Sequence, residues 1–201
     1  MNKSEIIKGA LNKSMTYREY RSLIDDLMEN NKTTGENHSE AMINYTQLNL
    51  ARMNKWDKRF IPSEEAKAIV GSEKKEIWLL ITEAWCGDAA HNVPVLHKLA
   101  ELNPNVDLRL VLRDENLNLM DLYLTNGGRS IPKLIRLEAD GLKEIDTWGP
   151  RPKAAQEMVM DAKKNGVDHD EYVKQLQIWY ARDMGKTMEA EILDALKAKV
   201  I

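Results

Sequence analysis

One cysteine lies where the chain is predicted to change from a buried strand to a helix. The apolar run over 77–82 has the length and continuity of a strand covered on both faces, and Cys86 opens the helix that follows. The first turn of a helix offers unpaired N–H groups and the positive end of the helix dipole, which favour a thiolate. The negative charge of Asp88 opposes that effect. Cys86 is therefore the candidate nucleophile for thiol–disulfide exchange.

Cys86 is the single cysteine of the 201-residue chain, so no disulfide forms within the chain. A disulfide at Cys86 would join it to another protein or to a small thiol. Asp88 and His91 add groups of the kind that bind metals, but residues five apart, such as Cys86 and His91, do not share a face of a helix. We expect neither a metal nor a cofactor at this position.

The elements that must position Cys86 alternate between helices and strands, which indicates the α/β class. Apolar spacing predicts helices over 16–30, 39–61, 63–70, 86–102 and 116–124. Strands are predicted over 76–82, 106–112, 133–138 and 143–148. The first two strands are joined through a helix and should pair in parallel, whereas the last two flank Asp140-Gly141 and should form an antiparallel hairpin.

Prolines and a glycine mark the remaining helices. Pro150 and Pro152 should start a helix that runs through Ala162, because a proline in the first turn loses no hydrogen bond. A helical tail over 169–199 should break at Gly185. The aromatic and methionine residues of the outer helices recur at helical spacing and should pack on the core. They include Tyr45, Trp56, Tyr172, Trp179 and Met188.

The segment Ala84-Trp85-Cys86-Gly87-Asp88-Ala89 resembles the Trp-Cys-Gly-Pro-Cys active site of the thioredoxin family. Pro94 follows the cysteine by eight residues, as in the active-site helix of that family, and Ile131-Pro132 resembles its cis-proline loop. The resemblance covers 74–165 and implies a thioredoxin-like fold, a central mixed sheet flanked by helices. Extra helical segments over 1–73 and 166–201 should pack on this core to give one compact domain.

The resemblance also implies roles for the residues around Cys86. As the catalytic residue, Cys86 would be flanked by Trp85, Gly87, Asp88, Ile131 and Pro132, which would contact substrate or shape the site. Each of three residues also has a purely structural explanation that is equally adequate. Asp88 could cap the helix, Pro132 could set the loop geometry, and Trp85 could simply pack against its neighbours. The segment 113–115, which ends a strand, is either solvated or helps to shape the site.

Three positions depart from the family pattern. Ala89 stands where the family has its resolving cysteine, so a second thiol of the chain cannot release a mixed disulfide. Asp88 stands in place of the central proline. Leu80, six residues before Cys86, stands in place of the buried acid that serves proton transfer in thioredoxins, and Glu83 is nearby without an assigned role.

Two functions remain open on these residues. In the first, Cys86 carries out monothiol thiol–disulfide exchange with protein thiols or disulfides, or with a small-molecule thiol. In the second, the domain is a redox-inactive module that binds other proteins. The added helices could also join two copies into a homodimer. The segment Trp148-Gly149-Pro150-Arg151-Pro152 resembles a bacterial branch of thioredoxin-like proteins of undefined function.

The composition of the chain indicates which partners and which cellular location to expect. A formal net charge of −3 with mixed acids and bases gives no basic stripe for nucleic acid. No run of eighteen apolar residues and no signal-like N-terminus appears, so we expect no membrane partner. A single cysteine is typical of a reducing compartment, and a cytoplasmic location is the expectation.

Overall fold

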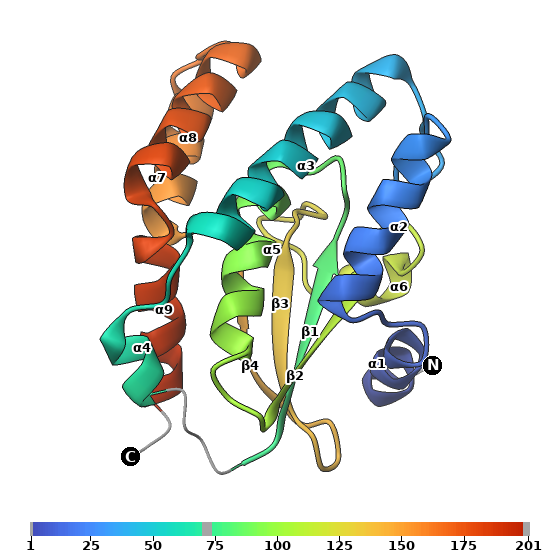
Figure 1. Ribbon diagram of the computed structural model, residues 1–201, viewed down its shortest axis with the longest axis vertical. Coiled ribbons are helices and arrows are strands. Elements are labelled where there is room, and N and C mark those ends of the chain that lie inside the picture. The colour runs from blue at the N-terminus through green and yellow to red at the C-terminus, as the bar shows by residue number, and fades with distance from the viewer. Residues whose placement is uncertain (1, 70–73, 199–201) are drawn as a thin grey trace.

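Four strands form one mixed sheet at the centre of the chain. The structure, a computed structural model, describes residues 2–69 and 74–198. The sheet order is β2-β1-β3-β4, with β1 Glu76–Thr82, β2 Val106–Leu112, β3 Lys133–Glu138 and β4 Glu144–Trp148. β1 pairs in parallel with β2 and antiparallel with β3, which pairs antiparallel with β4 (Figure 1). The predicted α/β class and mixed sheet are confirmed.

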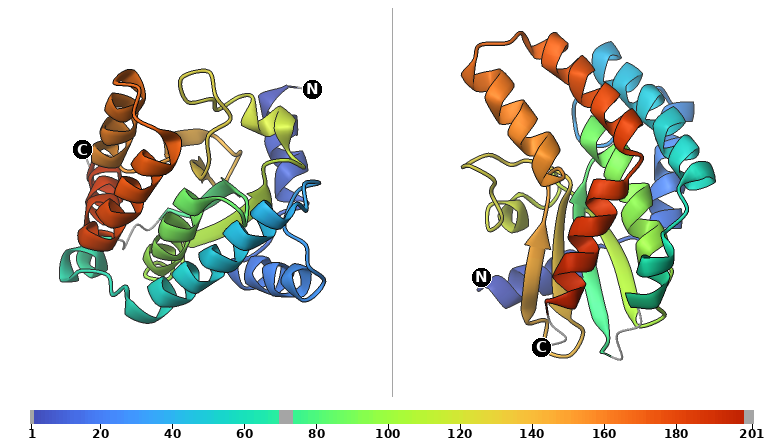
Figure 2. Two further views of the ribbon diagram at one scale, coloured as in Figure 1. Left: turned by 90° about the horizontal axis from the view of Figure 1, so that it is seen from above. Right: turned by 90° about the vertical axis from the view of Figure 1, so that its left-hand side faces the viewer.

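Helices cover both faces of this sheet. The described residues form α1 Lys3–Leu11, α2 Tyr17–Glu29, α3 Glu40–Arg59, α4 Glu64–Ile69, α5 Gly87–Ala100, α6 Leu117–Met120, α7 Lys153–Lys164, α8 His169–Asp183 and α9 Lys186–Lys197. α5 lies against the sheet with α3 packed over it, whereas α1 and α6 lie toward the other side (Figure 2). α7, α8 and α9 stand along one flank. None of the described helices is long and apolar enough to cross a membrane.

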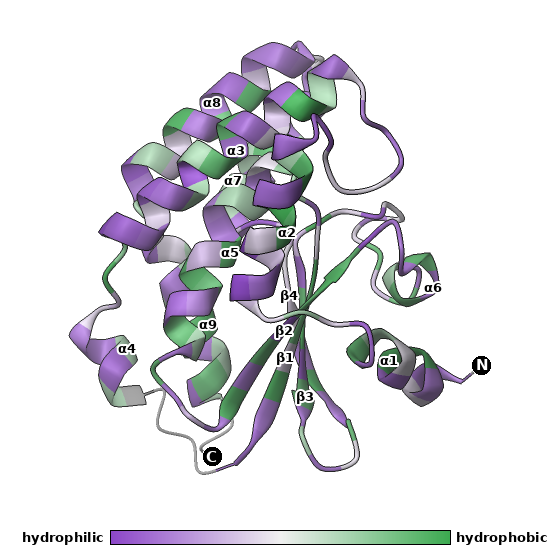
Figure 3. Cartoon of the chain, turned by 45° about the vertical axis from the view of Figure 1, so that its right-hand side comes forward, coloured by the Kyte–Doolittle hydropathy of each residue, from purple (hydrophilic) through white to green (hydrophobic). Residues whose placement is uncertain are grey.

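The core forms around β1. Trp78, Leu79, Leu80 and Ile81 have no solvent exposure, as expected of a strand with helices on both faces. Figure 3 shows apolar residues along the strands and polar residues on the outer turns of α3 and α8. This burial fixes the end of β1, and therefore the start of α5, where Cys86 lies.

Most predicted boundaries hold, and the differences have local causes. α6 is shorter than the predicted 116–124, because the chain after Met120 makes turns and then the tight Thr125–Gly128 bridge. α1 was not predicted, although Asn2 and Glu5 form a capping box at its start.

The turns follow the sequence pattern, and the outer helices follow it in part, since Tyr172 and Trp179 pack on a separate small cluster and not on the main core. The hairpin turns at Gly141, and the helical tail breaks at Met184 and Gly185, all with positive φ. Trp56 packs against the core and Met188 is buried. Tyr45 was expected to be packed but is 51% exposed.

Candidate active site

The backbone before Cys86 is anchored by the N-terminal third of the chain. Thr34 Oγ1 accepts a hydrogen bond from the Ala84 N–H at 2.9 Å, and the side-chain amide of Asn49 on α3 donates to the Ala84 carbonyl at 2.9 Å. Arg52, one turn further along α3, donates to Asn49 Oδ1 at 2.8 Å. The position of Cys86 therefore depends on α3 as well as on β1.

Cys86 is the N-cap residue of α5 and faces the loop before β3. Its thiol donates a hydrogen bond to the carbonyl oxygen of Ile131 at 3.3 Å, and the Ile131-Pro132 peptide bond is cis, as predicted. The cysteine is only 9% exposed. The structure thus brings Cys86 together with Ile131 and Pro132, although Cys86 and Ile131 lie 45 residues apart in the sequence.

The electrostatic setting of the thiol differs from the expectation. Burial, followed by the negative charge of Asp88, raises the pKa of Cys86 to about 12. The N–H groups of Ala89 and Asp88 and the charge of Arg151 act in the opposite direction. The helix N-terminus lowers the pKa as argued from sequence, but desolvation is the larger effect. Cys86 is therefore a protonated thiol at neutral pH in this conformation.

Asp88 is a buried acid with two partners from the C-terminal part of the chain. Arg151 forms an ion pair with its Oδ2 at 2.7 Å, and the Tyr180 hydroxyl on α8 donates to its Oδ1 at 2.8 Å. Burial raises the pKa of Asp88, while Arg151 and the Tyr180 hydrogen bond oppose the rise. Asp88 thus joins α5 to α8 and to the segment after β4, and its side chain is not the N-cap of α5.

Arg151 is held in place by a close approach of two loops. Gly149 has φ +113°, and a Cβ there would lie 2.3 Å from the Pro132 carbonyl oxygen, so only glycine fits. The segment after β4 therefore crosses directly over the cis-proline loop. Arg151 donates to Gln156 Oε1 at 2.9 Å, and its buried Nε has no hydrogen-bond partner among the described residues.

Gly87 and Trp85 flank the cysteine on opposite sides. A Cβ on Gly87 would lie 3.6 Å from Arg52 on α3 and 3.7 Å from Gln177 on α8, so both added helical segments reach the motif. The guanidinium of Arg113 lies 4.7 Å from the ring centre of the half-buried Trp85. This contact places Arg113 beside the motif, and the site-shaping role of the segment 113–115 stays a prediction.

The acids near the end of β1 also have defined places. Leu80 is fully buried in the apolar core, so no carboxyl group occupies that position. Glu83 is fully buried as well, and its Oε1 accepts the Asp114 N–H at 2.9 Å. Burial raises the pKa of Glu83, and its Oε2 has no hydrogen-bond partner among the described residues.

His91 is buried between the two added helical segments. Its Nδ1 accepts a hydrogen bond from Trp56 Nε1 on α3 at 2.9 Å, and its Nε2 pairs with Gln177 Oε1 on α8 at 2.8 Å. The ring also stacks on Tyr180 with centres 4.3 Å apart. Burial lowers the pKa of His91 to about 4. His91 is a packed structural residue, and no group of potential metal ligands occurs within residues 2–69 and 74–198.

Arg151 and Tyr180 were not identified from the sequence as site residues. Arg151 lies in the segment Trp148-Gly149-Pro150-Arg151-Pro152, which resembles a branch of thioredoxin-like proteins. The sequence around Arg151 therefore offered a clue that this residue could belong to the site. Tyr180 had none, because an aromatic residue at helical spacing is typical of packing. Its contact with Asp88 spans 92 residues.

The sheet, the cysteine at the start of α5 and the facing cis-proline loop define a thioredoxin-fold protein with one buried cysteine. The chain belongs to the thioredoxin family: a family model described as thioredoxin matches residues 35–164. The matched range includes α3 and α4, which precede the core expected from sequence.

Two crystal structures resemble the chain across most of its length. A protein of unknown function from Pseudomonas aeruginosa, PA1234, has a TM-score of 0.56 and 16% identity, covering 92% of this chain and 98% of that one. An HIV epitope-scaffold has a TM-score of 0.52 and 16% identity, covering 92% of this chain and 99% of that one. These likenesses concern the fold. No curated protein sequence matches the chain.

Proposed function

We propose that this protein is a single-thiol member of the thioredoxin family that forms mixed disulfides through Cys86. The observation that carries the proposal is the position of the sulfur at the N-cap of α5, 3.3 Å from the Ile131 carbonyl oxygen and beside cis-Pro132. A partner that approaches along this loop meets the sulfur and a backbone hydrogen-bond acceptor together. Trp85, Gly87, Asp88, Ile131 and Pro132 would then border the partner.

The proposed reaction is an exchange between one thiol and one disulfide. Cys86 gives its proton to solvent, and the thiolate attacks one sulfur of a partner disulfide. The partner's sulfur–sulfur bond breaks, its second sulfur leaves as a thiolate, and a Cys86–partner disulfide forms. Because Ala89 provides no second thiol, a small thiol or another cysteine of the partner must attack the mixed disulfide and restore Cys86. The cytoplasmic location expected from the sequence would provide such thiols.

The buried state of the thiol favours a second function, a redox-inactive module that binds proteins. A pKa of about 12 leaves little thiolate at neutral pH, and the Asp88–Arg151–Tyr180 contacts lie over the start of α5. In that case the cysteine is a small buried residue and the added helices supply the binding surface.

Thiol reactivity as a function of pH separates the two functions. At pH 8 a pKa of about 12 lowers the thiolate fraction of Cys86 about 10³-fold relative to a free cysteine with a pKa of ~8.5. The higher nucleophilicity of a more basic thiolate offsets part of this, so exchange should be ~10²-fold slower than in a cysteine peptide. The rate should rise about tenfold per pH unit up to pH 10, whereas the peptide levels off near pH 9.

The measurement is intact mass after incubation with glutathione disulfide between pH 7 and pH 10. Cys86→Ser is the control for the site of the adduct, and the guanidinium-unfolded chain is the control for reagent quality. One adduct on the folded protein that a second thiol removes supports exchange. A folded protein that stays unmodified over the whole pH range, while the unfolded chain reacts, refutes exchange and leaves the binding module.

A further inference from the structure

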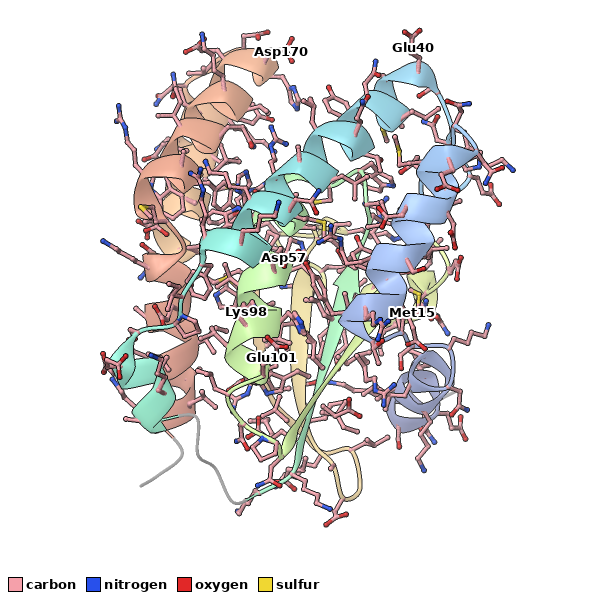
Figure 4. The ribbon with its side chains drawn as sticks, in the orientation of Figure 1. Met15, Glu40, Asp57, Lys98, Glu101 and Asp170 are labelled. Carbon is pink, nitrogen blue, oxygen red and sulfur yellow. The ribbon has the colours of Figure 1, made fainter. Side chains whose placement is uncertain are left out.

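A pocket of about 500 Å³ lies away from Cys86, where α3 ends beside the junction of α8 and α9. Figure 2 shows α9 continuing from α8 past the end of α3, and Figure 4 marks Asp57 near that end. The apolar wall includes Trp56 from α3, Phe60 and Ile61 just after its end, and Met184 from the junction. Ile61 is 76% exposed and Met184 is 57% exposed. Apolar side chains gathered at a concave site are typical of a ligand pocket.

The rim of this pocket is positively charged. Lys55 and Arg59 are four residues apart on α3 and share one face, while Lys186 reaches the rim from the first turn of α9. None of the three forms an ion pair within residues 2–69 and 74–198. The pocket has one acid, Glu189, whose Oε1 accepts the Ser63 N–H at 2.7 Å. Three positive charges therefore face one negative charge that is already hydrogen-bonded.

The backbone at the α8–α9 junction keeps the pocket in shape. Met184 and Gly185 both have positive φ, 57° and 80°. A Cβ on Gly185 would lie 3.1 Å from Phe60 Cε2 and 3.3 Å from Val95 Cγ2, so the junction packs directly on the end of α3 and on α5. This close packing fixes the two walls relative to each other before any ligand binds.

We propose that this pocket binds a small amphiphilic carboxylate of the fatty-acid class. The carboxylate lies between Lys55, Arg59 and Lys186, where charge-assisted hydrogen bonds are available. The hydrocarbon chain lies along Trp56, Phe60 and Met184. The volume is that of a small-molecule site, and the lining is confined to the end of α3, the residues just after it and the α8–α9 junction, whereas a groove for a peptide extends along an element. This site is separate from the exchange proposed at Cys86.

The first experiment compares two probes with the same chain length and different head groups. Octanoate and 1-octanol are titrated into the full-length protein by isothermal titration calorimetry, in low salt and below the concentrations at which octanoate forms micelles. Octanoate should bind at one site, at least ~10-fold more tightly than octanol, because only the anion meets the cationic rim. Equal affinities, or no saturable octanoate binding, overturn the proposal.

Variants then test the rim and the apolar wall separately. Arg59→Ala and Lys186→Ala should each lower the affinity for octanoate by ~3- to 10-fold and leave the affinity for octanol unchanged. Ile61→Ala should lower the affinity for both probes. Lys58→Ala is the matched control, because Lys58 is an exposed α3 residue that does not line the pocket. An effect of Lys58→Ala as large as that of Arg59→Ala refutes the site. The proposal is also refuted if the chain self-associates, if this association persists with saturating octanoate, and if Ile61→Ala breaks it. The apolar wall of the pocket would then be an interface between two copies of the chain.

Discussion

The two sides of Cys86 are built differently. Below it, β1 contributes Leu79, Leu80 and Ile81 to a large core in which each has no exposure. Above it, α7 and α8 have a small cluster of their own, Ala155, Val159, Leu176 and Tyr180. Near the cysteine, α8 meets α5 through hydrogen bonds and one stacked ring pair. The hairpin of α7 and α8 is therefore the wall whose local opening costs least, and the sheet is the fixed wall.

The largest effect should come from the fixed wall. Leu80→Ala removes a fully buried side chain from the middle of β1 and should lower the free energy of unfolding by about 3 kcal/mol. Leu48→Ala is the control, because Leu48 is 55% exposed and its loss should change stability by less than about 0.5 kcal/mol. Urea unfolding followed by circular dichroism measures both. Similar midpoints for the two variants would contradict the central place given to β1.

A comparable effect should appear at acid pH through His91, where both walls meet. Burial lowers its pKa from 6.5 to about 4, so below pH 6.5 the unfolded chain binds a proton that the folded chain does not. The contribution of neutral His91 to the free energy of unfolding is therefore complete above pH 6.5 and is lost as the pH falls toward 4. The loss from this residue should be about 3 kcal/mol. Equilibrium unfolding at several pH values should show that His91→Gln reduces this loss. His169→Gln, at an exposed histidine, should not, and equal pH slopes in the two variants would refute the assignment.

Weakening the movable wall should change reactivity more than it changes the sheet. Leu176→Ala removes a buried contact between α7 and α8, so the hairpin should open more often and Cys86 should react ~10-fold faster with iodoacetamide at pH 8. Hydrogen exchange should accelerate in α7 and α8 and stay slow in β1. If hydrogen exchange accelerates equally in β1, the sheet and the α7–α8 hairpin unfold as one unit, and the distinction between a fixed and a movable wall is wrong.

The smallest effect should come from removing one charge at the boundary. Asp88 is the second largest cause of the raised pKa of Cys86, after burial, so Asp88→Asn should lower that pKa and increase alkylation several-fold. Loss of the partner of Arg151 should also reduce stability. Asp170→Asn, an exposed acid on α8, is the matched control. A slower reaction of Cys86 in Asp88→Asn would contradict the charge assignment.

Much of the fold could be predicted because its signals are local. The apolar run of β1, Asp140-Gly141 at the hairpin and the Ile131-Pro132 pair each lie within a few residues of the structure they specify. α1 was missed because its nine residues are shorter than the window over which helical periodicity is usually recognised, although its capping box was present in the sequence.

The electrostatics of the site could not be predicted in the same way. From the sequence near Cys86, the helix N-terminus indicated a thiolate, and its effect on the pKa has the expected sign. The larger effect, burial, depends on the tertiary structure. Tyr180 meets Asp88 across 92 residues, and no periodicity in either segment specifies that contact.

The position of His91 has a consequence for how this chain can be divided. One ring nitrogen is held by Trp56, before the sheet, and the other by Gln177, after it, so the two flanking segments are linked through a side chain of the central helix. We therefore expect the flanking segments to stabilise the central part rather than to be separable additions to it. A fragment limited to 74–165 would lack both partners and would expose the imidazole, with the part of α5 around it, to water. The smallest self-sufficient version of this protein should therefore retain all three parts.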